Sequence, residues 1–251
     1  MIKFFRKIRY DLLEKNKSGK YLKYAIGEII LVVIGILIAL GINNWNQDRL
    51  SNQQQKVYLN NFKEELVSNN KLLQRIDAQY TKHQEETTKG ITLLTEDFRV
   101  SNFLTIDSLI HTRWRAFPVG GSTYEEMKNN GSFYSLHNKE LKKQIAQHYI
   151  TANSYASAFK EMNRNGQDIF NNKDLNAIEV LKYRLRQSPV NHKGIDTSWV
   201  HNPNSPFYQG LFKRAMHCKA TNTIRRGMIK DIIQSNNDII ESIDNELGNH
   251  D

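Results

Sequence analysis

The sequence predicts an all-α protein with one N-terminal transmembrane helix, followed by a periplasmic antiparallel helical bundle with a long juxtamembrane helix. Three observations predict this class: an apolar run near the N-terminus, apolar residues that recur every three or four positions afterwards, and no convincing pair of alternating strands. We expect three segments: a cytoplasmic basic amphipathic segment over residues 1–24, the transmembrane helix over 25–45 and the periplasmic helical-bundle domain over 46–251.

The transmembrane helix is predicted from a run of 14 residues, 29–42, that has no polar side chain. Tyr24 and Trp45 flank this run, 21 positions apart. At about 1.5 Å per residue they would stand roughly 31 Å apart along a helix, which matches a hydrocarbon core of about 30 Å. Aromatic rings prefer the two interfaces of a bilayer, so this spacing favours a spanning helix over the core helix of a soluble domain.

Charge predicts the orientation of this helix. Residues 1–24 carry eight basic and two acidic side chains, and only Asp48 and Arg49 follow closely on the other side. The basic side is expected to stay in the cytoplasm, so the N-terminus is cytoplasmic and the C-terminal domain crosses the inner membrane into the periplasm. Apolar residues on one face of the basic segment are typical of an interfacial helix on anionic lipid, or of an ordinary basic flank.

A cleaved signal peptide is the alternative to a retained anchor. Ala39, Leu40 and Gly41 offer the small residues that a signal peptidase needs. The long basic region and the polar exit toward Trp45 favour retention instead. A mature chain that starts near Ile42 would decide for cleavage.

Three residues of the predicted span are candidate contact residues. Glu28 is ionisable, which by default suggests a functional site, although at this depth it can also reach the lipid headgroups beside Lys20 or Lys23. Gly35 and Ala39 form a small-xxx-small pair that would let a second helix approach closely and so indicates dimerisation.

Two stretches resemble a known family. They are MIKFFRKIRYDLLEKNKSGKYLKYAIGEIILVVIGILIALGINNWNQDR at the N-terminus and TYEEMKNNGSFYSLHNKELKKQIAQHY over residues 123–149. They resemble an uncharacterised family of single-pass membrane proteins, a domain of unknown function common in flavobacteria and their relatives. The signature is GEIILVVIGILIAL followed by INNWN, and Gly41 stands where the family more often has Gln. The resemblance implies a Gram-negative inner membrane and no particular activity.

The juxtamembrane helix is predicted from a heptad-like stripe that begins at Leu59 and from the absence of proline before the mid-90s. Asn69 and His83 are expected to fill inward positions of this stripe, and Gly90 is a weak point. A second apolar pattern over residues 103–114 ends at a break over residues 118–121.

The following helices are predicted from their caps. Ser122 and Thr123 precede two glutamates in the arrangement of a capping box, and Gly131 is expected to end that short helix. Asn138 is expected to cap a helix that runs to about Phe170.

Two further helices complete the predicted bundle. A shorter one ends before Pro189 and a long loop, from which Trp199 is expected to pack back on the bundle. The C-terminal helix has a wide apolar stripe with Asn236 in an inward position, where a buried amide can fix register.

Composition excludes several classes of function. Of the net charge of +9, residues 1–24 supply +6, and the remaining charge is spread without a basic aromatic patch, so we expect no nucleic-acid partner. The histidines are scattered and no catalytic or phosphate-binding motif is present, so we expect no metal, no cofactor and no enzyme. Cys218 is the only cysteine; it is expected to be buried and inert, or else to crosslink two chains.

A local concentration of aromatic residues can line a ligand or partner pocket, or can plug the end of the bundle. It consists of Trp114, Arg115, Phe117, Tyr124, Phe133 and Tyr134. We therefore predict a protein-interaction, scaffold or sensor module that contacts membrane lipids and either a protein partner or a second copy of itself. The alternative is a small-ligand-binding or enzymatic envelope protein with its site near these aromatic residues. The candidate contact residues are Glu28, Gly35, Ala39, Trp114, Arg115 and Tyr124.

Overall fold

The computed structural model describes residues 18–172, 175–188 and 193–248, without the side chains of residues 18–21 and 24. The predicted basic amphipathic segment therefore lies largely outside the described residues, as does the side chain of Lys20, and their predicted roles at the membrane stay predictions. The helix predicted to end before Pro189 does so, because it stops at Gln187; residues 189–192 themselves are not described.

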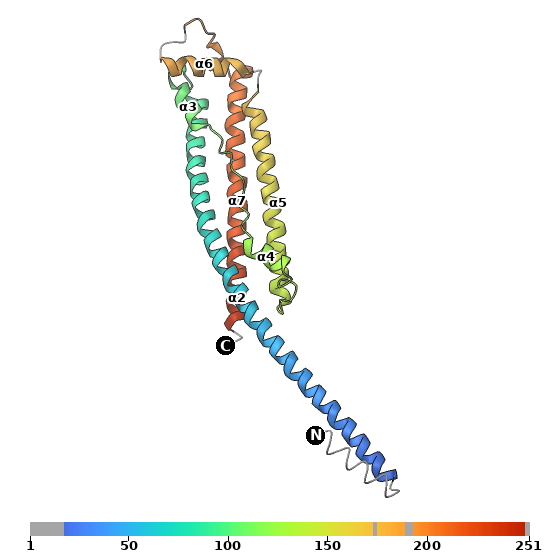
Figure 1. Cartoon of the computed structure of the whole chain (residues 1–251). Helices are drawn as coiled ribbons and strands as arrows, with labels where there is room; N and C mark the ends of the chain where they lie inside the picture. Colours follow the sequence, from blue (N-terminus) through green and yellow to red (C-terminus); the bar gives the residue numbers. More distant parts are fainter. Residues whose placement is uncertain (1–17, 173–174, 189–192, 249–251) are drawn as a thin grey trace. The chain divides into compact units, whose positions relative to one another are not determined.

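The described residues form helices and their connections, without a strand, which confirms the all-α class. Figure 1 shows the order of the elements along the chain. They are α2 (Ser18–Glu96), η1 (Val100–Asn102), α3 (Phe103–Leu109), α4 (Ser122–Asn129), α5 (Lys139–Phe170), α6 (Asn176–Gln187), η3 (Ser198–His201) and α7 (Pro206–Gly248).

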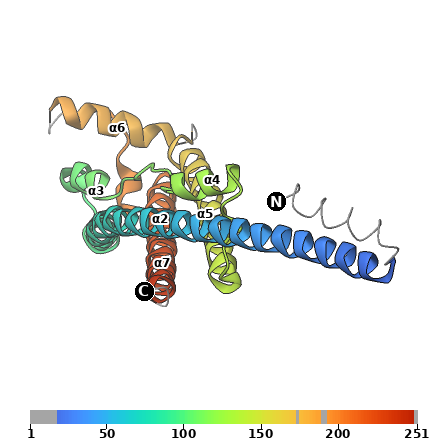
Figure 2. The same cartoon turned by 60° about the horizontal axis from the view of Figure 1, so that its bottom comes forward.

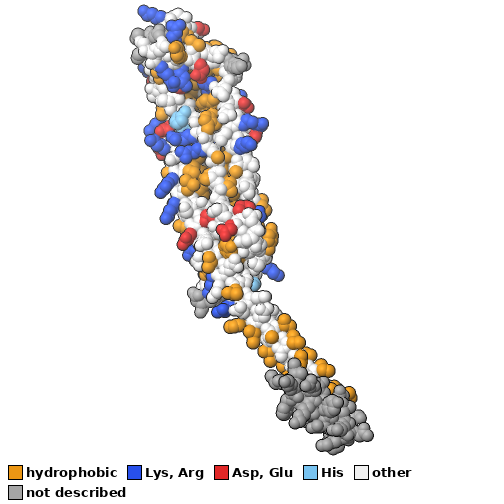
Figure 3. Space-filling view, viewed as in Figure 1, with side chains coloured by type: hydrophobic (Ala, Val, Ile, Leu, Met, Phe, Trp, Pro, Cys, Tyr) orange, Lys and Arg blue, Asp and Glu red, His pale blue; other side chains and the backbone are white. Residues whose placement is uncertain are grey.

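The chain divides into two compact units, Met1–Val57 and Tyr58–Asp251, and each is described by itself. In the first unit α2 is apolar and exposed. Its large apolar side chains between residues 29 and 42 are 47–63% exposed, and Figure 3 shows them along this stretch. This is the one helix among the described residues that is long and apolar enough to cross a membrane.

Helix α2 extends without a break from Ser18 to Glu96, which confirms the prediction of a continuous helix that reaches the mid-90s. It passes through Gly90, where α3 approaches closely. A Cβ atom at Gly90 would lie 2.9 Å from Cγ1 of Ile110 and 3.0 Å from Cβ of Leu109. Gly90 therefore serves close packing and does not interrupt the helix.

The second unit is built on three long helices whose directions follow from the core clusters that they share. One cluster joins residues 59–66 of α2, residues 141–149 of α5 and residues 239–243 of α7. The next joins residues 73–80, residues 152–159 and residues 229–232 of the same three helices. Residue numbers rise together in α2 and α5 and fall in α7, so α2 and α5 are parallel and α7 is antiparallel to both (Figures 1 and 2).

The parallel pair arises because residues 111–121, which are extended, return the chain along the unit before α4 and α5 begin (Figure 1). The sequence-based expectation of an antiparallel bundle does not include this parallel pair. An extended connection has no hydrophobic period that would predict its path.

The inward face of α7 follows an uninterrupted four-three spacing over most of its length, and every member is at most 4% exposed. Such a spacing places each side chain in one seam against neighbouring helices. The members are Leu211, Ala215, Cys218, Asn222, Arg225, Ile229, Ile232, Asn236, Ile239 and Ile243.

The matching column of α2 includes Asn70, at 9% exposed, where the sequence predicted Asn69. Asn70 Nδ2 donates to Oδ1 of Asn237 (2.8 Å), and Asn236 Nδ2 donates to Oδ1 of Asn70 (2.8 Å). Asn69 lies beside this column, and its side chain fills the space where a Cβ atom of Gly120 would stand. The prediction for Asn69 was wrong by one position because the register depends on a partner in α7. His83 is buried as predicted.

The caps of α4 and α5 differ in origin. At α5 the side chain of Asn138 accepts from the amides of Glu140 (3.1 Å) and Leu141 (3.0 Å), as predicted. The predicted capping box of α4 is wrong, because the helix begins at Ser122 with no side-chain cap from Gly121. Instead, an oxygen of Glu65, far away in α2, accepts from the hydroxyl of Ser122 (2.9 Å).

Two loop predictions are confirmed. Gly131 follows the end of α4 with φ +82°, a conformation that favours glycine. Trp199, in η3, is 3% exposed. Its ring packs edge-on against Phe98 and Phe103, with centroid distances of 5.8 and 6.2 Å.

Candidate functional site: a buried arginine under the 111–121 segment

A polar layer interrupts the apolar seam of the second unit at the middle of α7. Asn222 and Arg225 are 1% and 2% exposed, and they face Tyr80 and His83 of α2, each 1% exposed. These four residues occupy positions where the repeat elsewhere places apolar side chains. The layer therefore exists despite the cost of burying polar groups.

The 111–121 segment crosses this layer and is held there by side chains of α5 and α7. The carbonyl of Arg113 accepts from Nη1 of Arg225 (3.2 Å), and that of Arg115 accepts from Nδ2 of Asn163 (2.9 Å). The thiol of Cys218 donates to the carbonyl of His111 at 3.4 Å. These contacts supply the backbone partners that an extended segment outside a sheet lacks.

Arg225 is the most unusual residue of the layer. Its second amino group donates to Oδ1 of Asn163 (2.7 Å), and its guanidinium lies over the rings of Tyr80 (5.8 Å) and Phe159 (5.3 Å). Among the described residues, none of the carboxylates forms an ion pair with it. Neutral acceptors and ring faces thus compensate the charge only in part, whereas buried charges are ordinarily paired.

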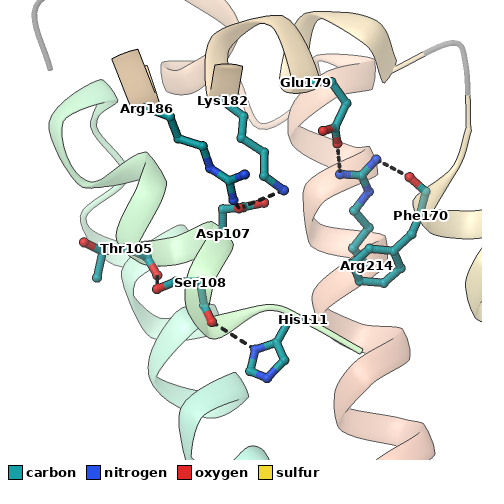
Figure 4. Close-up of polar contacts among 9 residues, drawn as sticks. All are labelled: Thr105, Asp107, Ser108, His111, Phe170, Glu179, Lys182, Arg186 and Arg214. Atoms are coloured by element: carbon teal, nitrogen blue, oxygen red, sulfur yellow. Dashed lines mark hydrogen bonds and ion pairs between the residues drawn. The ribbon is translucent and has the colours of Figure 1, made fainter. Parts of the chain in front are cut away.

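Arg214, about three turns earlier in α7, shows the ordinary arrangement. It is 3% exposed, yet Nη1 donates to Oε1 of Glu179 (3.0 Å) and Nη2 to the carbonyl of Phe170 (2.7 Å), as Figure 4 shows. In the same view Asp107 of α3 pairs with Lys182 (2.9 Å) and Arg186 (3.7 Å) of α6. The cations drawn at this end of the unit are therefore matched by carboxylates.

Two guanidinium Nε atoms of the arginine layer, those of Arg225 and Arg113, are buried without an acceptor. The hydroxyl of Tyr80 is contacted by the side chain of Arg225 but has no acceptor for its own proton, and the ring of His83 is contacted by the backbone of His111. Buried donors without an acceptor are rare in proteins.

The electrostatics of the layer are dominated by cations. Burial raises the pKa of Tyr80, and the charges of Arg225, Arg115 and Arg113 offset part of this rise. Burial also lowers the pKa of His83, assisted by His111, whose ring centroid lies 4.3 Å away. Tyr80 and His83 are consequently neutral at pH 7, and neither supplies a negative charge.

The structure divides the aromatic residues that the sequence placed together. Trp114 is 42% exposed and packs edge-on against Phe170, with a centroid distance of 6.2 Å. Phe117 is buried against Phe159 at 5.1 Å. Arg115 is exposed and follows Trp114 in the sequence. Trp114, Arg115 and Phe117 are thus the three of the six predicted residues that lie along the 111–121 segment.

The other three lie around α4. Tyr124 is 9% exposed and stacks on Tyr149, with a centroid distance of 4.0 Å and an interplanar angle of 6°. Phe133 packs edge-on against Tyr124 at 5.2 Å and in turn contacts Tyr134 at 5.7 Å. Tyr124 and Phe133 belong to an apolar core cluster, which fits the interpretation of a core plug for this half.

The three candidate residues of the predicted span lie in α2 within the first unit. Glu28 is half-buried, whereas Gly35 and Ala39 are exposed, and no atom lies within 4 Å of a Cβ position built at Gly35. There is room for a close neighbour at Gly35, but the structure holds one copy of the chain, so contact with lipid or a second helix stays a prediction.

Cys218 is 1% exposed, in agreement with the prediction that it is buried, and burial raises the pKa of its thiol to about 12. Within the described part of the chain, no three side chains among His, Cys, Asp and Glu are placed to hold a metal ion.

Arg225 was not among the predicted residues, because an arginine in a helix ordinarily indicates the solvent face. A signal was present: the four-three repeat through Ile232 and Ile229, continued toward the N-terminus, reaches Arg225 and then Asn222. The contribution of Asn163, on a different helix, has no comparable signal in the sequence.

Comparison with known protein families identifies a match for this chain. The model of a family of unknown function, DUF6090, matches residues 28–185. No curated protein and no solved structure matches the chain. The matched region contains α3 to α5 and most of α2 and α6, whereas α7, which carries Arg225, lies beyond it.

Proposed function

The chain belongs to the DUF6090 family of unknown function, and we propose that it is a single-pass inner-membrane protein whose periplasmic helical bundle acts as a protein-interaction module. Its N-terminus would lie in the cytoplasm. Its partner would be another envelope protein or a second copy of the chain.

The observation that carries this proposal is the exposed apolar stretch of α2. Eleven of residues 29–42 are Ile, Leu or Val, and each favours insertion by about 0.3 to 0.6 kcal/mol near the centre of a bilayer. Together they contribute roughly 3 to 7 kcal/mol, which over most of this range exceeds the cost of about 2.5 to 3.5 kcal/mol for one ionised group at the centre. Glu28 lies near the end of the stretch, where that cost is smaller.

The orientation rests on the excess of basic residues before this stretch. It is tested by cysteine labelling in a Cys218→Ala background, with Lys23→Cys on the proposed cytoplasmic side and Ser154→Cys, exposed on α5, on the other. A membrane-impermeant maleimide, applied to cells with a permeabilised outer membrane, should label position 154 directly and position 23 only after lysis. The reverse pattern would contradict the orientation.

The interaction role is supported by the precision of the domain's packing. The contacts among Asn70, Asn236 and Asn237 fix the register of α2 against α7, and buried amides of this kind select one arrangement at some cost in stability. A domain of fixed shape next to a membrane anchor suits docking. Contacts between this domain and a partner can be captured in living cells by a crosslinker placed at defined positions.

Photo-crosslinking residues at Gly35 and at Ser154 test the two kinds of partner. A crosslink to a second copy from position 35 would indicate helix pairing, and a crosslink from position 154 to another protein would indicate docking. If neither position gives a protein adduct in cells grown under several conditions, the interaction role is wrong.

A second candidate function, binding of a small ligand, is favoured by one observation, the buried and unpaired charge of Arg225. This charge lies under the part of the 111–121 segment that carries Trp114 and Arg115, two of the residues that the sequence singled out. Whether the protein is an enzyme stays a prediction, and no reaction is proposed.

A further inference from the structure

We propose that the arginine layer binds a small oxyanion, either free phosphate or the carboxylate of a small molecule, between Arg113 and Arg225 beside the hydroxyl of Tyr80. This inference goes beyond the proposed function. Neither membrane anchoring nor protein docking requires an anion in the domain, and either can be right if the anion site is wrong.

Arg225 lacks a countercharge within the described residues. Arg214 and Arg225 are buried to the same degree in the same helix, but only Arg214 has a carboxylate, from Glu179 at 3.0 Å. A buried guanidinium without an anion loses its hydration and gains no equivalent interaction. An oxyanion that accepts from Arg225 would restore to this layer the pairing that Arg214 has within the protein.

Internal groups do not supply the missing charge. The phenol of Tyr80 and the thiol of Cys218 are the ionisable neighbours that would be anionic if deprotonated, and burial raises the pKa of both, that of Cys218 to about 12. Asp77, in the next turn of α2, accepts from Nε of Arg226 at 2.9 Å. None of these groups therefore supplies a negative charge to Arg225.

The buried atoms of this layer that lack a partner are donors. Nε–H of Arg225 and Nε–H of Arg113 are buried without an acceptor, and the hydroxyl of Tyr80, whose oxygen is contacted by the side chain of Arg225, has no acceptor for its proton. Two nearby acceptors, the carbonyl of Arg113 and Oδ1 of Asn163, already accept from Arg225. Unused donors with occupied acceptors fit an anion and disfavour a cation or a donor-rich neutral ligand.

The segment that covers the layer is partly open to solvent. Arg225 and Tyr80 are buried, but Arg113 is half-buried, and Arg115 and Trp114 are exposed on the same extended segment. The residue whose carbonyl accepts from Arg225 is thus itself partly accessible. The charge of Arg115 acts on the hydroxyl of Tyr80, as do those of Arg113 and Arg225. A positive potential at the surface would attract small anions to this point.

The test is isothermal titration of the full-length chain in detergent with inorganic phosphate, sulfate, acetate and chloride at constant ionic strength. Wild-type protein should bind phosphate or acetate saturably and chloride at least tenfold more weakly. Arg113→Gln should weaken that binding at least tenfold, and Tyr80→Phe, which keeps the ring, should weaken it severalfold. Arg164→Gln, which removes an equal charge from the exposed face of α5, should leave it unchanged.

The titrations with different anions distinguish the two sources of the oxyanion. Binding of phosphate and sulfate without acetate identifies a tetrahedral anion, and binding of acetate alone identifies a carboxylate. Three results would overturn the proposal: no saturable binding of any oxyanion, equal binding of chloride, or unchanged binding in Arg113→Gln. Far-ultraviolet circular dichroism of each variant at the titration temperature confirms that the helices are intact.

Discussion

Replacement of Glu65 by alanine should destabilise the second unit through a helix that is 57 residues away in sequence. One carboxylate oxygen of Glu65 accepts both from the hydroxyl of Ser122 (2.9 Å) and from the amide of Thr123 (2.8 Å). It therefore occupies the place of an N-cap for α4, whose own Gly121 offers no side chain.

The magnitude follows from these two contacts. A hydrogen bond to an ionised group contributes about 1.5 to 3 kcal/mol, and loss of an N-cap costs about 0.5 to 2 kcal/mol. The second oxygen of Glu65 is buried without a partner, which offsets part of the gain. We expect a loss of about 1.5 to 2 kcal/mol in the free energy of unfolding, or a decrease in Tm of about 3 to 8 °C for a domain of this size.

The assay is thermal and urea unfolding of the full-length chain in detergent, followed by circular dichroism, with Glu64→Ala as the control. Glu64 is exposed on the same turn of α2, so its replacement should change the free energy by less than about 0.5 kcal/mol. Hydrogen exchange at the amides of α4 should increase in Glu65→Ala and not in Glu64→Ala. Equal stability of the two variants would refute the long-range cap.

Three further predictions concern the packing of the long helices. Burial lowers the pKa of His148 to about 4; because the unfolded imidazole titrates near 6.5, the unfolded state binds the proton first and stability falls as pH decreases from 6.5 toward 4. The loss in the free energy of unfolding between pH 7 and 5 should be about 2 kcal/mol smaller in His148→Gln than in the wild-type protein. An equal loss in the two proteins, measured by urea unfolding at both pH values, would exclude the effect. Asn236→Leu should cost about 1 to 3 kcal/mol because it leaves Oδ1 of Asn70 without its donor, whereas the double variant with Asn70→Leu should recover much of this loss in a double-mutant cycle. Gly90→Ala should destabilise the protein by about 1 to 3 kcal/mol, since the new Cβ would lie 2.9 Å from Cγ1 of Ile110. Gly227→Ala, in open space within α7, should instead stabilise it by about 0.5 to 1 kcal/mol. Shifts of Tm in the same direction for the two variants would contradict this explanation.

Features that depend on local sequence were predictable. Asn138 and Gly131 act through their own backbone or that of the next few residues, so the start of α5 and the end of α4 could be predicted from residue type and spacing. The continuous helix to Glu96 followed from the absence of proline and from its apolar stripe.

Features that depend on a distant partner were not predictable. The cap of α4 comes from Glu65, and the choice of Asn70 over Asn69 depends on Asn236 and Asn237 in α7. The candidate site has the same origin, since Arg225 becomes a buried cation only through contacts with residues of α2, α5 and the 111–121 segment. A single sequence offers the repeat that contains Arg225 but not the identity of the residues opposite it.

The measurement that most directly tests the central claim, a retained membrane anchor formed by the apolar stretch of α2, is the intact mass of the chain from carbonate-washed membranes. We expect the protein to stay in the membrane pellet and to be released only by detergent, with the mass of the chain that still begins with the basic segment. A mass that corresponds to a chain starting near Ile42, recovered in the soluble fraction, would contradict it.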